Sequence, residues 1–142
     1  MKYLKKYENS NLLKNYQYLK EELTNFFKKE FPNEYKIKNN RLITKHENVK
    51  YFVFYINDTK IFEADLKNDN IKIYIRNYYK NDEDIDILIK YFINILLIPE
   101  KLSINSNYYI YTINDKNDIK KIVNNLNDND FNLFKTTTKY NL

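Results

Sequence analysis

Acidic and basic side chains that alternate along one predicted strand are the residues best suited to chemistry. Glu63, Asp65 and Lys67 are two positions apart, and side chains at that spacing point to the same face of a strand. Asp58 precedes them, in a turn predicted at residues 57–60. This is the most enzyme-like pattern in the chain.

The pattern of Asp58 followed by Asp65-Leu66-Lys67 resembles the motif of the PD-(D/E)xK nucleases. In that family the acids bind a divalent metal ion and the lysine helps to orient the attacking water. The family core runs helix, three strands, helix, strand, which overlaps the order predicted below. The resemblance implies a metal-dependent nuclease. A solvent-facing stripe on a surface strand is the alternative explanation of the same residues.

Residue types that other catalytic sites require are missing or scarce. The chain has no cysteine and no glycine, and its one histidine, His46, lies in a predicted loop. Glycine-rich phosphate loops and nucleophile elbows therefore cannot form, and cysteine cannot act as a nucleophile or a zinc ligand. The acids at 82–86 lack the glycine and the glutamate of a calcium loop, and we interpret them as the start of a helix. We expect no enzyme activity, no cofactor and no bound metal.

Positive charge is concentrated in the first part of the chain. Residues 1–60 hold 13 Lys/Arg and 7 Asp/Glu, a net charge of +6, so the remainder contributes −1 to the total of +5. Five cations lie within fifteen residues that contain one acid: Lys36, Lys38, Arg41, Lys45 and Lys50. They predict a patch that follows nucleic-acid phosphates, with Tyr35 and Tyr51 available to stack on bases. The alternative is a lysine-rich solvated face, which the presence of only two arginines favours.

Tyrosine is abundant, with 15 copies in 142 residues. Exposed tyrosine is enriched in protein interfaces, because it offers a large contact area at low entropy cost. Two adjacent pairs are the interface candidates: Tyr78, Tyr79, Tyr108 and Tyr109. The codon bias of an AT-rich genome, such as that of a low-GC bacterium or its phage, is a competing explanation for the number of tyrosines.

Hydrophobic periodicity predicts an α+β fold in one domain over residues 1–142. We expect an antiparallel meander sheet of four to five strands covered by helices, in the order α-β(3–4)-α-β-α. The predicted helices are 10–31, capped by Ser10, then 82–98 and 115–126, and the predicted strands are 41–45, 50–57, 61–67, 71–76 and 108–113. The sequence leaves open whether the extended segment 35–38 also joins the sheet. Asn39-Asn40 is predicted as a hairpin turn, and residues 136–142 as a frayed tail.

These observations favour a small non-enzymatic interaction protein that binds a macromolecular partner, either a protein or a nucleoprotein. An anti-CRISPR-type inhibitor of host defence, encoded by a phage or mobile element, is one form of this class, and a secretion-chaperone-like protein is another. A basic nucleic-acid-binding module is the alternative, and the nuclease is the second alternative. The nearly all-round apolar helix at 82–98 must be covered twice, by another helix or by a second copy in a homo-oligomer. We expect a cytoplasmic protein without membrane contact, because the N-terminal sequence lacks the apolar region of a signal peptide.

Overall fold

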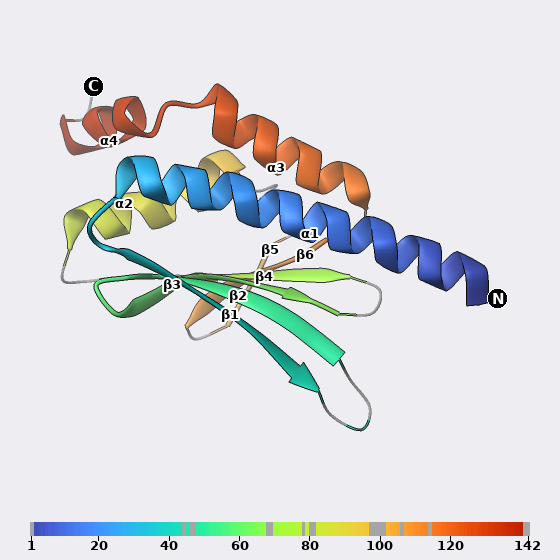
Figure 1. Ribbon diagram of the computed structural model, residues 1–142. Coiled ribbons are helices and arrows are strands. Elements are labelled where there is room, and N and C mark those ends of the chain that lie inside the picture. The colour runs from blue at the N-terminus through green and yellow to red at the C-terminus, as the bar shows by residue number, and fades with distance from the viewer. Residues whose placement is uncertain are drawn as a thin grey trace.

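A computed structural model describes residues 2–43, 45, 48–67, 70–77, 79, 82–96, 102–105, 107–113 and 115–140. The chain has the α+β fold that the sequence predicts, with all helices on one side of one antiparallel sheet (Figure 1). The elements are α1 (Lys2–Glu30), β1 (Tyr35–Ile43), β2 (Asn48–Ile56), β3 (Thr59–Leu66), β4 (Ile71–Arg76), α2 (Glu83–Tyr91), the π-helical turn η1 (Phe92–Leu96), β5 (Leu102–Ile104), β6 (Tyr108–Ile113), α3 (Lys116–Asp128) and α4 (Phe131–Tyr140).

The sheet has six strands in the order β1-β2-β3-β4-β6-β5. Strands β1 to β4 form the predicted meander. The chain then passes through α2 to the far edge as β5 and returns as β6, which pairs with β4. The sheet has one strand more than the upper prediction of five, because the short strand β5 carries no sequence pattern of its own.

The turn between β2 and β3 lies where the sequence predicts one, within residues 57–60. Asn57 and Asp58 have φ values of 49° and 66°, and they form a two-residue hairpin loop. This left-handed conformation usually requires glycine, and Asn and Asp are the residues that tolerate it best after glycine.

The hairpin predicted at Asn39-Asn40 is wrong. Strand β1 continues through both residues, with Asn39 opposite Phe52 and Asn40 opposite Tyr51. The pairing with β2 is unbroken from Tyr35 to Ile43, so a long partner strand outweighs a local preference for a turn.

Helix α1 is longer than the sequence predicts. It begins at Lys2, so Ser10 lies inside the helix and is not its N-cap. Its fully buried positions are Leu19, Leu23 and Phe27, whereas Phe26 is half-buried. The helix ends at Glu30, before Pro32, as expected from the missing backbone N–H of proline.

Helix α2 begins as predicted. The side chain of Asp82 caps it by accepting hydrogen bonds from the backbone N–H groups of Asp84, at 2.9 Å, and Ile85, at 3.3 Å. The α-helical part ends at Tyr91, and the turn η1 follows. The predicted end of this helix, at 97–98, lies outside the described residues.

A fourth helix replaces most of the predicted frayed tail. Helix α4 continues to Tyr140 because Phe131 packs edge-on against Tyr91, with ring centroids 5.2 Å apart. Lys139 also forms an ion pair with Asp84 at the start of α2, at 2.8 Å. Helix α4 therefore contributes to the second covering layer over α2, which the sequence left open between another helix and a second copy.

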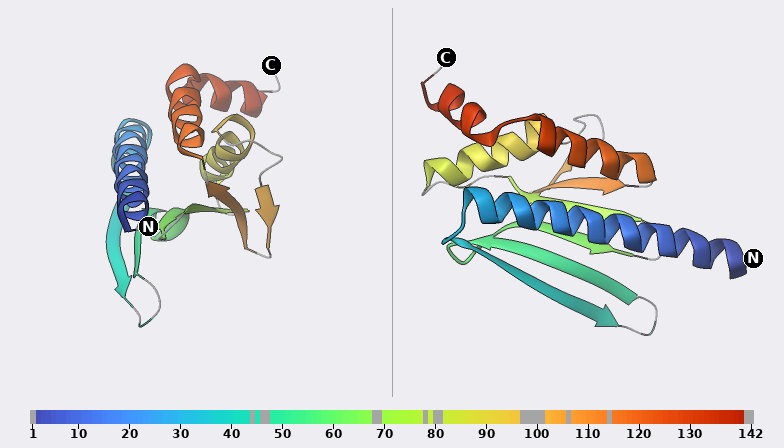
Figure 2. Two further views of the ribbon diagram at one scale, coloured as in Figure 1. Left: turned by 90° about the vertical axis from the view of Figure 1, so that its right-hand side faces the viewer. Right: turned by 45° about the horizontal axis from the view of Figure 1, so that its top comes forward.

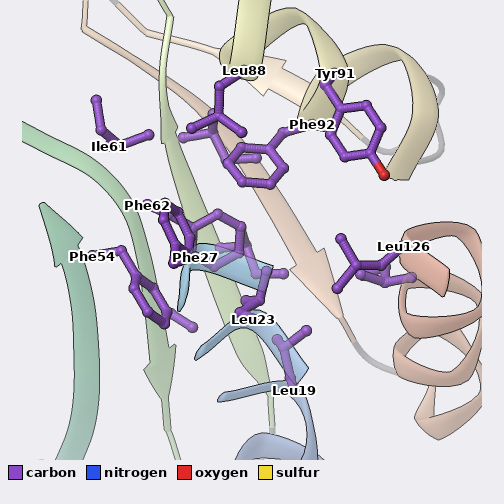
Figure 3. Packing of buried hydrophobic residues seen from close by; sticks show 14 of the residues in the cluster. Leu19, Leu23, Phe27, Phe54, Ile61, Phe62, Leu88, Tyr91, Phe92 and Leu126 are labelled. Atoms are coloured by element: carbon purple, nitrogen blue, oxygen red, sulfur yellow. The ribbon is translucent and has the colours of Figure 1, made fainter. Parts of the chain in front are cut away.

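One hydrophobic cluster joins the helices to the sheet (Figure 3). At its centre Phe27 of α1 stacks on Phe54 of β2, with ring centroids 4.4 Å apart and an interplanar angle of 10°. Phe92 and Phe62 meet edge to face at 5.5 Å. Because the helices cover one face only, the opposite face of the sheet is left without a covering helix in the described structure (Figure 2).

Candidate functional site

The uncovered face of the sheet, called the open face below, is the candidate functional site. The sheet bends so that its two outer strand pairs turn away from the helices, which places the open face on the inside of the bend (Figure 2). Strand alternation and register assign these side chains to it: Lys36, Lys38, Tyr51, Val53, Tyr55, Lys60, Glu63, Asp65, Lys72, Tyr74, Arg76, Tyr108, Ile110 and Thr112. Val53 is only 3% exposed, so its neighbours on this face cover it even without a helix.

An irregularity in β3 brings Lys60 and Glu63 onto the same face. Residues three apart on a regular strand point to opposite faces. Lys60 lies opposite Tyr55, whereas Phe62 lies opposite Phe54, so Ile61 is an extra residue that forms a β-bulge. Lys60 Nζ consequently forms an ion pair with Glu63, whose side chain is only 16% exposed.

Asp65 lies beside this pair and keeps its proton more strongly than an ordinary carboxyl group does. Burial raises its pKa from 3.8 to about 8, and a side-chain hydrogen bond with Glu63 and the charge of Glu63 act in the same direction. The charges of Lys60 and Lys67 act in the opposite direction. A proton retained on Asp65 lowers the repulsion between the two neighbouring carboxyl groups.

Two tyrosines complete this group. Lys60 Nζ lies 5.1 Å from the centre of the Tyr108 ring, a cation–π contact. The Tyr108 and Tyr74 rings meet edge to face at 6.4 Å. Burial raises the pKa of Tyr74, and the charges of Asp65 and Glu63 add to the effect. We call Lys60, Glu63, Asp65, Tyr74 and Tyr108 the polar cluster.

Sequence reasoning missed the polar cluster as a unit. The alternation along β3 and β4 predicted that Glu63 and Asp65 share a face, and this is confirmed. Lys60 could not be assigned to that face, because the bulge at Ile61 leaves no mark in the sequence. Tyr108 was selected only as an interface tyrosine, since its contact with Tyr74 depends on the pairing of β4 with β6.

The structure does not bring the acids of the nuclease-like motif together. Asp58 lies in the turn before β3, exposed, with its carboxylate 3.5 Å from Lys36 Nζ. Asp65 lies near the other end of the strand, about 20 Å away at the usual rise per residue. No group of three acids, histidines or cysteines suited to a metal ion occurs among the described residues. Asp58 and Asp65 therefore cannot bind one metal ion in this arrangement.

The predicted basic patch is divided between surfaces. Lys36 and Lys38 lie on the open face, where Lys38 Nζ is 5.1 Å from the centre of the Tyr55 ring. Arg41 and Lys50 lie opposite each other on the face that carries Phe52 and Phe54. Lys45 is exposed in the bend between β1 and β2. Positions an even number apart on one strand share a face, so Lys36 and Lys38 lie together and Arg41 lies on the other face.

The interface tyrosines are also divided. Tyr108 lies on the open face, and Tyr109 follows it on the helix side, packed against the core. Tyr79 is half-buried, and its hydroxyl accepts a hydrogen bond from Thr59 Oγ1 at 3.4 Å. Tyr78 lies outside the described residues. The rings that share the open face with Tyr108 are Tyr51, Tyr55 and Tyr74, which the sequence did not separate from the other tyrosines.

At least two pockets lie on the helix side among the described residues. One of about 330 Å³ lies between α1 and the junction of α3 with α4, with Phe26 and Phe131 in its lining and Lys29 and Glu30 among its charged residues. The other, of about 300 Å³, is lined by residues that include Ile93, Lys90 and Tyr109. Neither pocket is lined by any residue of the polar cluster.

Comparison with protein-family models, with curated proteins and with solved structures finds no match for this chain. Among the described residues, no helix has the length and apolar character needed to cross a membrane. Inference about function therefore depends on the surface itself.

Proposed function

We propose that this chain is a small non-enzymatic interaction protein that binds a macromolecular partner, in the first instance a protein, through the open face. One observation carries the proposal: the helices cover one face of a six-stranded sheet (Figure 2), and the strand register assigns four tyrosines and several charged side chains to the other face. Large aromatic rings surrounded by polar groups are typical of protein interfaces.

The contacts within the open face support a pre-formed binding surface. Lys60 is held by Glu63 and by the Tyr108 ring, and Lys38 is held over Tyr55. Side chains that are already ordered lose less conformational entropy when a partner docks. A rigid surface of tyrosines therefore favours affinity without requiring a fold change.

A narrower form of the proposal is an inhibitor of a host defence system, encoded by a phage or mobile element. The small size and the AT-rich codon bias support this origin, with 24 asparagines and 22 lysines in the chain. The partner would then be a host protein or nucleoprotein.

The test is affinity capture with a tagged chain and a variant that lacks two rings of the open face. The double variant Tyr74→Ala/Tyr108→Ala should lose the captured partner, with an affinity at least about 30-fold weaker, because the loss of a single central aromatic residue already costs about 2 kcal/mol. Tyr18→Ala, which removes an exposed ring from α1, is the matched control and should keep the partner. Equal capture by both variants, each shown to be folded by circular dichroism, would refute binding through the open face.

Single-stranded nucleic acid is a second candidate partner, and one observation favours it. Lys36 and Lys38 share the open face with Tyr51 and Tyr55, so cations and stacking rings alternate there. Nucleic-acid binding predicts an affinity that falls steeply with salt. Charge reversal of Lys36 and Lys38 should then abolish binding, whereas reversal of Arg41 and Lys50, on the opposite face, should have little effect.

A further inference from the structure

Strand β1 has a free edge that is long and regular. It has nine residues, pairs with β2 alone in the described structure, and contains no proline and no irregularity in its register. The outer N–H and C=O groups of an edge strand can bond to another extended chain. Exposed edges in natural proteins are usually short or interrupted, so an uninterrupted nine-residue edge is a candidate for strand addition.

The hydrogen bonds next to β1 identify the backbone groups that point outward. The N–H of Asn57 donates to the carbonyl of Glu34 at 3.1 Å, and these residues continue the β1–β2 register. Bonded and non-bonded pairs alternate in an antiparallel ladder. Lys36, Lys38, Asn40 and Leu42 are therefore bonded to β2, and the backbone groups of Ile37, Asn39, Arg41 and Ile43 face the free edge. The N–H of Tyr35 agrees with this assignment, because it donates to Phe31 and not to β2.

The charge of β1 indicates which chain would fit. The strand contains Lys36, Lys38 and Arg41 and no acidic residue, a net charge of +3. A second copy of β1 would place +3 beside +3, and like charges across a strand pair are destabilising. A strand with acidic side chains would instead meet lysines on the open face and Arg41 on the other face.

The end of the strand adds an apolar contact. Leu42 and Ile43 are 54% and 67% exposed, one on each face of the sheet. An aliphatic residue in the added strand would remove this apolar surface from water.

We propose that the outer edge of β1 binds an extended acidic peptide segment of a partner protein as a seventh strand. The inference deepens the proposed function, since it rests on a protein partner and names the segment by which that partner is recognised. Backbone hydrogen bonds from Ile37, Asn39 and Arg41 provide the binding, and the basic side chains provide selectivity for acidic residues.

The probe is a fluorescein-labelled ten-residue peptide of alternating Glu and Val, with a Lys/Val peptide of the same length as its control. Fluorescence anisotropy in 150 mM salt should show binding of the Glu/Val peptide only. Asn39→Pro removes one outward N–H and leaves the bonds to β2 in place, so it should weaken binding at least 10-fold. Asn39→Ala, which keeps the N–H, should bind within about 2-fold of the wild type.

A second measurement uses the unaltered protein, in case Asn39→Pro disturbs folding. Amide hydrogen exchange followed by NMR should slow at Ile37, Asn39 and Arg41 when the Glu/Val peptide is added. The amides of Lys38 and Asn40, already bonded to β2, should change little and serve as internal controls.

Several results would overturn the proposal. Equal binding by folded Asn39→Pro and Asn39→Ala would show that backbone pairing is not involved, and unchanged exchange at the outward amides would show the same. If the wild-type chain dimerises and does not bind the peptide, and if Asn39→Pro abolishes the dimer, the strand that pairs with β1 is a second copy of this chain. Displacement of the peptide by a tighter-binding thymidine oligonucleotide would identify nucleic acid.

The double variant Tyr74→Ala/Tyr108→Ala separates this inference from the proposed open-face interface. It should bind the Glu/Val peptide as the wild type does, because neither ring lies on β1 or β2. Loss of the captured partner with retained peptide binding would support both surfaces. If the double variant still captures the partner, while Asn39→Pro loses peptide binding, the open face is rejected and the edge of β1 is left as the binding element.

Discussion

The two faces of the sheet share one backbone but carry different side chains, apolar on the helix side and mostly polar on the open face. Strand β4 shows both, because Ile71, Ile73 and Ile75 are fully buried under the helices while Lys72, Tyr74 and Arg76 on the open face are half-buried. On the helix side apolar burial stabilises the contacts, and on the open face ion pairs, hydrogen bonds and ring contacts order the side chains. The difference shows that a face without a helix can still be organised.

The two faces should therefore respond differently to substitution. Apolar truncations on the helix side leave cavities that the surroundings fill only in part. On the open face the charged side chains of β3 and β4 are half-buried, so water still reaches them. Substitutions there should therefore change stability less than substitutions on the helix side, and by an amount that depends on pH.

The largest effect is expected for Phe27→Ala on the helix side. Its ring stacks on Phe54, and its loss should lower the free energy of unfolding by about 3–5 kcal/mol. Tyr55→Ala on the open face should cost about 0.5–1.5 kcal/mol. Urea denaturation followed by circular dichroism measures both, and equal losses would contradict the contrast between the faces.

The next largest loss of stability is expected when one of two ion pairs on the open face is broken. Lys60→Met leaves the half-buried Glu63 without its partner and should lower stability by about 1–3 kcal/mol. Lys36→Met breaks the exposed pair with Asp58 and should cost less than about 0.5 kcal/mol. Thermal unfolding at pH 7 measures both, and a larger loss for Lys36→Met would show that the polar cluster is fully solvated.

A pH effect should follow from Asp65. Its pKa in the folded protein is raised from 3.8 to about 8, so the folded state holds a proton that the unfolded state releases. The stability it contributes is complete below about pH 4 and is lost as the pH rises through about 8. Because solvent reaches the half-buried carboxyl, the loss should be on the order of 1–2 kcal/mol, and Asp65→Asn should remove it.

Melting temperatures from pH 5 to pH 9 test this effect. The control is Asp58→Asn, which alters an exposed carboxyl and should keep the slope of the wild type. A slope that survives in Asp65→Asn would assign the titration to one of the ionisable groups around it, which are Glu63, Lys60, Lys67, Tyr16, Tyr74 and the cross-strand neighbours Tyr51 and Lys72.

The smallest effect is expected at the turn between β2 and β3. Asp58→Ala places a Cβ-bearing residue without a polar side chain at φ 66°, and it should cost about 1 kcal/mol. Asp58→Gly should be close to neutral, because glycine adopts this conformation freely. If both variants lose the same stability in urea unfolding, the carboxylate of Asp58 matters and its backbone conformation does not.

Much of the fold could be predicted from local patterns. The bounds of β4 and β6, the Asp82 cap and the turn at Asn57-Asp58 each depend on residues within a few positions of one another. Strand β5 and helix α4 could not be predicted in the same way. Strand β5 is only three residues long and carries no pattern of its own, and helix α4 depends on the Tyr91 ring, which lies far along the chain.

The sequence by itself determined the α+β class, the alternation that places Glu63 beside Asp65, and the excess of positive charge in the first sixty residues. Tertiary structure alone decided which charges share a surface. The bulge at Ile61 adds Lys60 to the acids, the unbroken β1 separates Lys38 from Arg41, and the β4–β6 pairing brings Tyr108 to Tyr74. The physical reason is that a one-residue change in register moves a side chain to the other face, and register is set by pairing between distant strands.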